Sequence, residues 1–277
     1  MTPRIPTILS LATAALLQTA CQQPDVNCTS AHGTFAARFE RKSGPADQPC
    51  GQLVGDILGM STYYAPGGVN NTPKFAEPSV AIRALYLYEY IYTQVYDPTT
   101  VFDTRKIDME VGDPDSLGDF AAGLPDDEGF CAVPKMSKVN LDLPEVVEVV
   151  EVVEVIDDPL TQEDETVEPV APVAPQAAAT LAYEWSKVKF LVTPDAQGTQ
   201  FSADLKFTQD ACTATYHVVG VYPAIGCIGE DGTPDNTVCE SDVNGINPDF
   251  PTECLVFSEG IAYCVLTEEP PAYDNAA

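Results

Sequence analysis

"YEWSKVKFLVTPDAQGTQFSADLKFTQDACTATYHVVGVYPA", residues 183–224, decides the fold. In each of its three segments apolar side chains alternate with polar ones, which is the pattern of a half-buried strand. Pro194 with "DAQG", and then the "TQDAC" segment, supply the turns between the segments. The stretch therefore predicts three consecutive antiparallel strands whose shared apolar face carries Val188, Phe190, Val192, Phe201, Ala203, Leu205, Phe207, Ala214, Tyr216, Val218 and Tyr222.

The same alternation occurs near the N-terminus, where "GTFAARFE" places Phe35, Ala37 and Phe39 on one face. No stretch of helical period competes with these patterns, so we predict a mainly β, antiparallel sandwich-like fold stabilised by disulfides. The segments "KMSKVNLDL" (135–143) and "LAYEWSKVKF" (181–190) could pair as neighbouring strands of a single domain. Two smaller domains remain an alternative, because the chain is long enough for either arrangement.

An acidic interval separates the two β-rich regions and reads "PEVVEVVEVVEVIDDPLTQEDETVEPVAPVAPQAAAT", residues 144–180. Glu recurs every third residue from Glu145 to Glu154, which gives neither a helix nor a strand a clean apolar face. Its prolines further oppose regular structure. We predict a long acidic, proline-rich, disordered loop or linker over 145–180. The alternative is that the Val-rich triplets add a strand to the edge of a sheet. The chain then divides into a signal peptide (1–20), a tether (21–30), an N-terminal β region (31–144), this linker (145–180) and a C-terminal β region (181–277) that could pack with the first as one domain.

The N-terminus has the layout of a secretory signal. Arg4 precedes an uncharged apolar stretch that is too short to span a bilayer permanently. Thr19 and Ala20 then precede Cys21, as in the lipobox of bacterial lipoproteins, although Gln18 stands where Leu is usual. The alternative is a simple secretion signal, which a bulky residue at Gln18 disfavours. We predict an exported protein that is attached to the membrane by acyl chains, palmitate among them, on Cys21.

The cysteine count supports export. There are nine cysteines, and an odd number in an exported protein leaves one thiol to explain. With Cys21 assigned to lipid, eight remain, and no Cys-x-x-Cys spacing indicates a zinc or thioredoxin-like site. An oxidising compartment is therefore predicted, with disulfides formed by Cys28, Cys50, Cys131, Cys212, Cys227, Cys239, Cys254 and Cys264.

Specific pairings are predicted from local geometry. "CLVFSEGIAYC" (254–264) looks like a hairpin turning at Ser258–Gly260, which would place Cys254 opposite Cys264. We therefore predict a Cys254–Cys264 bridge. Cys28–Cys50 and Cys227–Cys239 follow from proximity in the sequence alone.

The charge balance excludes one class of partner. The chain has 42 Asp and Glu against 13 Lys and Arg, and removal of residues 1–20 takes away only Arg4, which leaves 12 − 42 = −30. Such a surface repels nucleic acid and anionic headgroups. Membrane attachment must then come from the acyl chains rather than from electrostatic docking.

A run of tyrosines is the candidate binding face. If "ALYLYEYIYTQVY" (84–96) is a strand, it places Tyr86, Tyr88, Tyr90 and Tyr92 on one side. Tyrosine offers a flat apolar ring with a polar tip, which suits a glycan or a peptide. A tyrosine ladder packed between layers is the structural alternative and the interpretation we favour.

Signals for metals and catalysis are weak. "GEDGTPDNTVCESDVNGINPDF" (229–250) is rich in oxygen ligands and could hold Ca²⁺, but it lacks the EF-hand spacing, so we predict an ordinary loop and no cofactor or metal. The two histidines, His32 and His217, belong to no recognisable catalytic motif. We predict that the protein is not an enzyme.

Several segments together resemble a group of lipoproteins encoded by myxobacteria: "TACQQPDVNC", "HGTFAARF", "YEWSKVKFLVT", "CTATYHVVGVYPAIGC" and "GINPDF". The resemblance implies a lipoprotein of the outer membrane or cell surface, and it brings no known activity or catalytic residue. We therefore expect a structural or binding component of the envelope, with an envelope protein or a glycan as partner. A glycan-acting hydrolase or a carbohydrate-binding module is the alternative.

Overall fold

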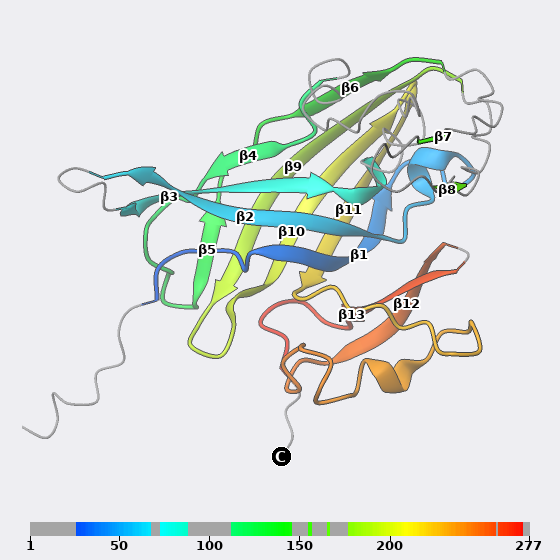
Figure 1. Ribbon diagram of the computed structural model, residues 1–277. Coiled ribbons are helices and arrows are strands. Elements are labelled where there is room, and N and C mark those ends of the chain that lie inside the picture. The colour runs from blue at the N-terminus through cyan, green and yellow to red at the C-terminus, as the bar shows by residue number, and fades with distance from the viewer. Residues whose placement is uncertain are drawn as a thin grey trace, which may run out of the picture.

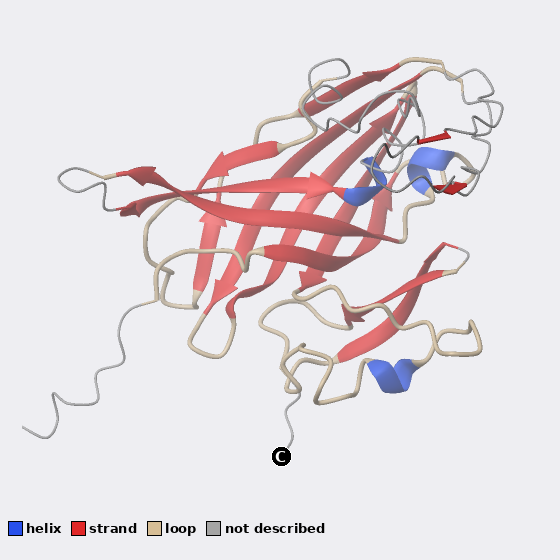
Figure 2. Cartoon of the chain, in the orientation of Figure 1, coloured by secondary structure: helices blue, strands red, loops and turns tan. Residues whose placement is uncertain are grey.

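The structure, a computed structural model, describes residues 26–67, 73–87, 112–145, 155–156, 165–166, 177–258 and 260–273. The predicted mainly β, antiparallel fold is confirmed (Figure 2). The helical elements are short, and in the part of the chain that the structure describes no helix is long and apolar enough to cross a membrane. The elements are β1 (Gly33–Ser43), η1 (Pro49–Gly51), β2 (Gly55–Pro66), β3 (Pro73–Ala84), β4 (Ser116–Asp119), β5 (Phe130–Val133), β6 (Val139–Leu143), β7 (Val155–Ile156), β8 (Glu165–Thr166), β9 (Ala179–Val192), β10 (Gln197–Gln209), β11 (Cys212–Val221), η3 (Asn236–Val238), β12 (Thr252–Ser258) and β13 (Ile261–Leu266).

Nine strands form one antiparallel sheet in the order β4-β3-β2-β1-β11-β10-β9-β5, with β6 also pairing with β9 (Figure 1). The sheet curls until its two ends meet. Gly118 in β4 forms a bridge with Met136, and the Ala121 amide donates to the Ala132 carbonyl at 2.8 Å. Because β6 (Val139–Leu143) pairs with β9 (Ala179–Tyr183), the strands that flank the acidic interval are neighbours in this sheet.

The interior of the curl holds the main core. The faces predicted for residues 183–224 and 33–40 point into it, and Phe35, Phe190 and Phe201 are fully buried there. The rings of Phe35 and Phe201 meet edge to face with centroids 5.6 Å apart, a favoured aromatic geometry. The strand alternation was therefore a sound guide to which side chains are buried.

One irregularity in β9 changes which face points inward. Trp185 and Val188 are three residues apart, yet both lie in the core, which strict alternation forbids. The register with β10 shifts between Ser202 and Asp204, and Lys187 adopts a positive φ of 52°. A bulge at Lys187 therefore inserts one residue, which lets both Trp185 and Val188 face the core.

Residues 224–273, named here the C-terminal module, cover part of the outer face of the sheet, over β1 and β11 (Figure 1). β13 lies against β1 and β11, so that Val219 and Val221 pack on the outside of the sheet against Phe250 and Cys264. The buried side chain of Gln200 donates to the Ala272 carbonyl at 2.8 Å and accepts from the Ala272 amide at 2.9 Å. This clamp fixes the end of the module to β10.

All eight cysteines predicted to form disulfides do so, but none of the three predicted pairings is correct. The bridges are Cys28–Cys131, Cys50–Cys212, Cys227–Cys254 and Cys239–Cys264. Cys254 does oppose Cys264 in the β12–β13 ladder, as the sequence predicts, although the turn shifts so that Ser258 pairs with Ile261. Directly opposed side chains project on the same side of a hairpin, and the loop that precedes it lies on that side. Cys254 and Cys264 therefore each bond to a cysteine of that loop instead of to each other.

The Cys28–Cys50 prediction is wrong for a related reason. Cys28 precedes β1 and bonds to Cys131 in β5, which lies at the far end of the strand order beside β9. Cys50 lies in η1 and bonds to Cys212 at the start of β11, the strand next to β1. Closure of the sheet joins the first pair and the β1–β11 ladder joins the second, and proximity in the sequence reveals neither.

The acidic interval is only partly described. β9 begins at Ala179, inside the range predicted as linker, and β7 and β8 form a two-residue ladder within it. The rest of the predicted loop, residues 146–154, 157–164 and 167–176, lies outside the described residues.

Candidate functional site

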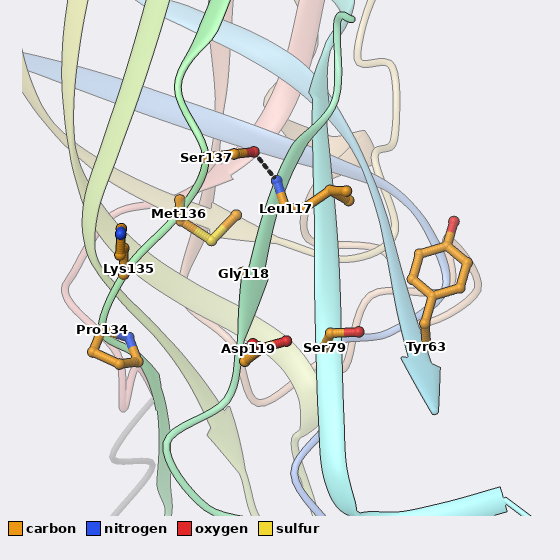
Figure 3. Close-up of a pocket in the computed structure, with 9 residues that line it drawn as sticks. All are labelled: Tyr63, Ser79, Leu117, Gly118, Asp119, Pro134, Lys135, Met136 and Ser137. Atoms are coloured by element: carbon orange, nitrogen blue, oxygen red, sulfur yellow. Dashed lines mark hydrogen bonds between the residues drawn. The ribbon is translucent and has the colours of Figure 1, made fainter. Parts of the chain in front are cut away.

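A surface groove over β2, β3 and β4 is the candidate site (Figure 3). Its floor is one row of cross-strand neighbours, since Ser79 in β3 pairs with Tyr63 on one side and with Asp119 on the other. Side chains directly opposed across an antiparallel pair lie close together on the same face. Strand register therefore places a phenol, a hydroxyl and a carboxylate side by side.

The chain between β5 and β6 forms the second wall of the groove. The Ser137 amide donates to the Leu117 carbonyl at 2.7 Å, and the Leu117 amide donates to Ser137 Oγ at 2.7 Å (dashed in Figure 3). Gly118 permits this approach, because a Cβ at that position would lie 2.4 Å from Met136 Sδ. The hollow has a volume of about 730 Å³, within the range of ligand sites, and is lined by Tyr63, Ser79, Leu117, Gly118, Asp119, Pro134, Lys135, Met136 and Ser137.

The chemistry of the groove suits an amphipathic ligand. Tyr63 and Leu117 are 55% and 51% exposed and so offer apolar surface to a ligand. Lys135 and Asp119 add one charge of each sign, and Ser79 adds a hydroxyl. A second hollow, lined in part by Tyr64, shares Tyr63, Ser79 and Asp119 with the first, so Tyr63 stands between two depressions. Such an arrangement can stack a flat ligand face on the Tyr63 ring while polar groups orient it.

Of the four tyrosines of the predicted binding face, the structure describes Tyr86. β3 ends at Ala84 and residues 85–87 form a helical turn, so the strand predicted through Tyr86 is wrong. The Asp56 carboxylate accepts from the Tyr86 amide at 3.0 Å, while Leu87 is buried in the core. Tyr86 is partly buried, with its ring edge to face with Phe207. Tyr88, Tyr90 and Tyr92 lie outside the described residues.

Tyr63 was missed by sequence reasoning. The sequence does contain a signal for its position. Met60 in β2 is buried, so by strand alternation Ser61 and Tyr63 lie on the opposite, outer face. Nothing local to β2 shows that the 134–137 segment stands opposite and turns an exposed tyrosine into one wall of a groove.

The two histidines lie on the outside of the sheet. His32 Nδ1 is 2.9 Å from Ser61 Oγ, which is a nucleophile–base distance, but no described carboxylate contacts His32 as the third group of a triad. His217 lies between the carboxylates of Asp204 and Glu269, the latter from the C-terminal module. Lys187 also donates to Asp204 at 2.6 Å, and this contact, with a smaller effect of His217, lowers the pKa of the Asp204 carboxyl.

In the loop considered for Ca²⁺, the oxygen atoms are used by local turns. Asp231 Oδ1 accepts from the amide and hydroxyl of Thr233, which lowers the pKa of the Asp231 carboxyl, and Asp235 accepts likewise from Thr237. Asn236 accepts from the Cys254 amide. These side chains therefore shape the loop beside the hairpin.

One cluster among the described residues has the compactness of a metal site, and it consists of the sulfurs of Cys227, Cys239 and Cys264, which lie within 4.8 Å of one another. All three are in disulfides, and a disulfide sulfur is not the thiolate that metals bind. The cluster is the place where the two bridges of the C-terminal module meet. Cys21, the predicted lipid site, lies outside the described residues.

Comparison with known proteins points to one family. The family model described as MlpA matches residues 33–223, which run from β1 to just beyond β11. A Myxococcus xanthus protein named "Putative lipoprotein MlpA" is 31% identical over 99 residues, which cover 35% of this chain and 41% of the relative. The match thus spans about two fifths of the length of that relative. No solved structure gives a significant match. The resemblance to myxobacterial lipoproteins that the sequence predicts is confirmed.

Proposed function

The chain belongs to the MlpA family, and on this premise we propose that it is an exported lipoprotein, anchored through Cys21, that acts as a binding component of the cell envelope. The signal-like segment before Cys21 and the name of the Myxococcus xanthus relative, "Putative lipoprotein MlpA", support the anchor. Four disulfides among the described residues support an oxidising compartment. The outer membrane or the cell surface is the location proposed.

One observation carries the binding role. The groove over β2–β4 exposes Tyr63 and Leu117 beside Asp119 and Lys135, on a surface that the curled sheet holds rigidly. Rigid placement lowers the entropic cost of binding. The partner proposed is a glycan of the envelope or an exposed segment of an envelope protein, which both combine apolar faces with hydroxyl or amide groups.

The geometry favours binding over hydrolysis. Glycosidases use a pair of carboxyl groups that flank the scissile bond. The nine residues that line the groove include one carboxylate, Asp119. The Ser61–His32 pair also lies on the outside of the sheet, without a described carboxylate to orient the imidazole. We therefore propose a binding protein rather than a hydrolase.

The anchor is tested by Cys21→Ser in the native host, with Gln22→Asn as the matched control. We expect the control to remain in the membrane fraction and to incorporate labelled palmitate, because it keeps the acylated sulfur. Cys21→Ser should lose the label and leave the membrane fraction. Retention of both label and membrane attachment in Cys21→Ser would contradict the anchor.

The groove is tested with the full-length Cys21→Ser protein on isolated cell-wall glycan and on washed envelopes. Tyr63→Ala should weaken binding by about tenfold, the effect of losing about 1.4 kcal/mol of stacking and burial. Val54→Ala, at the far end of the same strand, is the control and should bind as the parent does. Equal binding by Tyr63→Ala and the parent would show that the groove is not the contact site.

A further inference from the structure

Two contacting aromatic side chains, and an apolar side chain from an adjacent segment, lie at one end of the sheet, next to the point where the N-terminal tether joins it. We name Tyr64, Phe75 and Leu124 the tethered-end patch. Phe75 is 46% exposed and Leu124 is 49% exposed, while the rings of Tyr64 and Phe75 meet edge to face with centroids 5.1 Å apart. An exposed Phe and Leu beside a Tyr form the kind of apolar cluster that marks an interaction surface.

The tether is fixed to this same end. The Cys28 amide donates to the Gly123 carbonyl at 2.8 Å, and the Cys28–Cys131 disulfide holds it there. Gly123 in turn lies against β3, because a Cβ on it would be 2.8 Å from Ala76 Cα and 3.0 Å from the Phe75 carbonyl oxygen. Cys28, Leu124 and Phe75 therefore belong to adjacent segments.

The length of the tether limits where the bilayer can be. Six residues separate Cys21 from Cys28, so even a fully extended tether of seven steps reaches about 25 Å. Val54 lies just before β2 and ten residues from Tyr64, so the two are about 34 Å apart along the strand direction. The acyl chains therefore hold the tethered-end patch closer to the bilayer than the opposite end of the sheet.

We propose that the tethered-end patch is a membrane-contact surface, with Tyr64, Phe75 and Leu124 seated in the interfacial region of a zwitterionic bilayer. The proposal rests on the anchor at Cys21 proposed above. Aromatic rings with a polar tip favour the headgroup level, and a bulky apolar side chain beside them adds buried area. The contact fixes the orientation of the protein on the membrane: the tethered end faces the bilayer, and the opposite end of β2 points away from it.

Charge decides the kind of bilayer. Asp126, Asp127 and Glu128 follow Leu124 after one proline and are exposed, whereas Lys74, next to Phe75, is paired with Glu77 at 3.3 Å. These carboxylates repel anionic headgroups. The contact is therefore with zwitterionic lipid, and anionic lipid should weaken it.

Lipid quenching of tryptophan tests the proposal on the mature, acylated, full-length protein in phosphatidylcholine vesicles whose acyl chains carry bromine. Phe75→Trp places the probe in the patch, and Val54→Trp, just before β2 at the opposite end of the sheet, is the control. The native Trp185 is 5% exposed inside the core and gives the same background in both variants. We expect a loss of emission in Phe75→Trp and none in Val54→Trp, with a smaller loss when anionic lipid is included.

Flotation of the same vesicles separates failure of the anchor from failure of the contact. If the protein does not float with the vesicles, the proposed anchor at Cys21 is wrong, and the proposed membrane contact, which rests on it, is wrong as well. If it floats but the two variants are quenched equally or not at all, the anchor stands and the proposed contact is overturned. As a second variant, Phe75→Asp with Leu124→Asp should float yet leave the vesicles about fivefold faster, because part of the buried apolar area is lost.

Discussion

The curled sheet and the C-terminal module achieve stability by different means. The sheet encloses a large core in which fully buried aromatic side chains such as Phe35, Phe190 and Phe201 touch one another. The module has a two-stranded hairpin, a small core, and two disulfides that link residues only 27 and 25 positions apart. A segment of about 50 residues buries too little surface to fold alone, so cross-links replace the missing core. The family match ends at residue 223, where the module begins.

The largest effect that separates the two regions should come from removing both disulfides of the module, by replacing Cys227, Cys239, Cys254 and Cys264 with alanine. Each bridge of this kind contributes about 2–4 kcal/mol. We expect limited proteolysis to remove the chain beyond residue 223 while the sheet stays intact. If proteolysis instead degraded the sheet and the module together, the two regions would not be separately stabilised, and the comparison would be contradicted.

The control for that variant removes a sheet bridge instead, with Cys50→Ala and Cys212→Ala. Because the sheet has its own core, we expect a lower unfolding midpoint but no new cleavage in the module.

The next largest effect concerns the core of the sheet. Phe201→Ala should lower the free energy of unfolding by about 3–5 kcal/mol, because it leaves a cavity between Phe35 and Phe190. Urea unfolding followed by the emission of Trp185 measures the change. Leu117→Ala, at a half-exposed position, is the control and should shift the midpoint little. A loss below about 1 kcal/mol for Phe201→Ala would show that this core is not tightly packed.

A smaller effect should come from the clamp that joins the two regions. Gln200→Leu leaves the amide and carbonyl of Ala272 buried without partners, at a cost of about 1–3 kcal/mol. We expect faster hydrogen exchange at the Ala272 amide with little change inside the sheet. Unchanged protection of that amide would mean that the clamp does not hold the tail.

The smallest effect is electrostatic. Lys187, and to a lesser degree His217, lower the pKa of Asp204 in the folded state, so this group stabilises the protein above its unfolded pKa and loses that contribution as pH falls below 3.8. Because Asp204 is about one-third exposed, Asp204→Asn should cost less than about 1 kcal/mol at neutral pH. Chemical unfolding at several pH values should show the difference between the two proteins vanishing in acid. If the difference in stability between the two proteins persisted at acid pH, it would come from packing rather than from the charge of Asp204.

The sequence predicts the strands better than the contacts between them. Period-two alternation identified the buried faces of β1, β9, β10 and β11, because burial of one sheet face imposes that pattern directly. Even there, the bulge at Lys187 left no trace in the residue types. Where alternation was extended past Ala84, the prediction failed, since the Asp56 carboxylate of the neighbouring strand β2 accepts from the Tyr86 amide in the turn that forms there.

The Cys28–Cys131 bridge and the groove depend on closure of the sheet and could not be predicted. Cys28 meets Cys131 across 103 positions, and the 134–137 segment faces Tyr63 only because β4 and β5 meet where the curl closes. Proximity in the sequence carries no information about either contact. The lipid site differs, because Cys21 is indicated by a local motif that needs no fold.

The intact mass of the protein from its native membrane fraction, alkylated without reduction, tests the central claim most directly. A chain that begins at Cys21, is heavier by acyl and glyceryl groups and carries no alkylated thiol is the predicted result, because the other eight cysteines are in disulfides. An unacylated mass, or an alkylated thiol, would contradict the account of a lipid-anchored protein stabilised by four bridges.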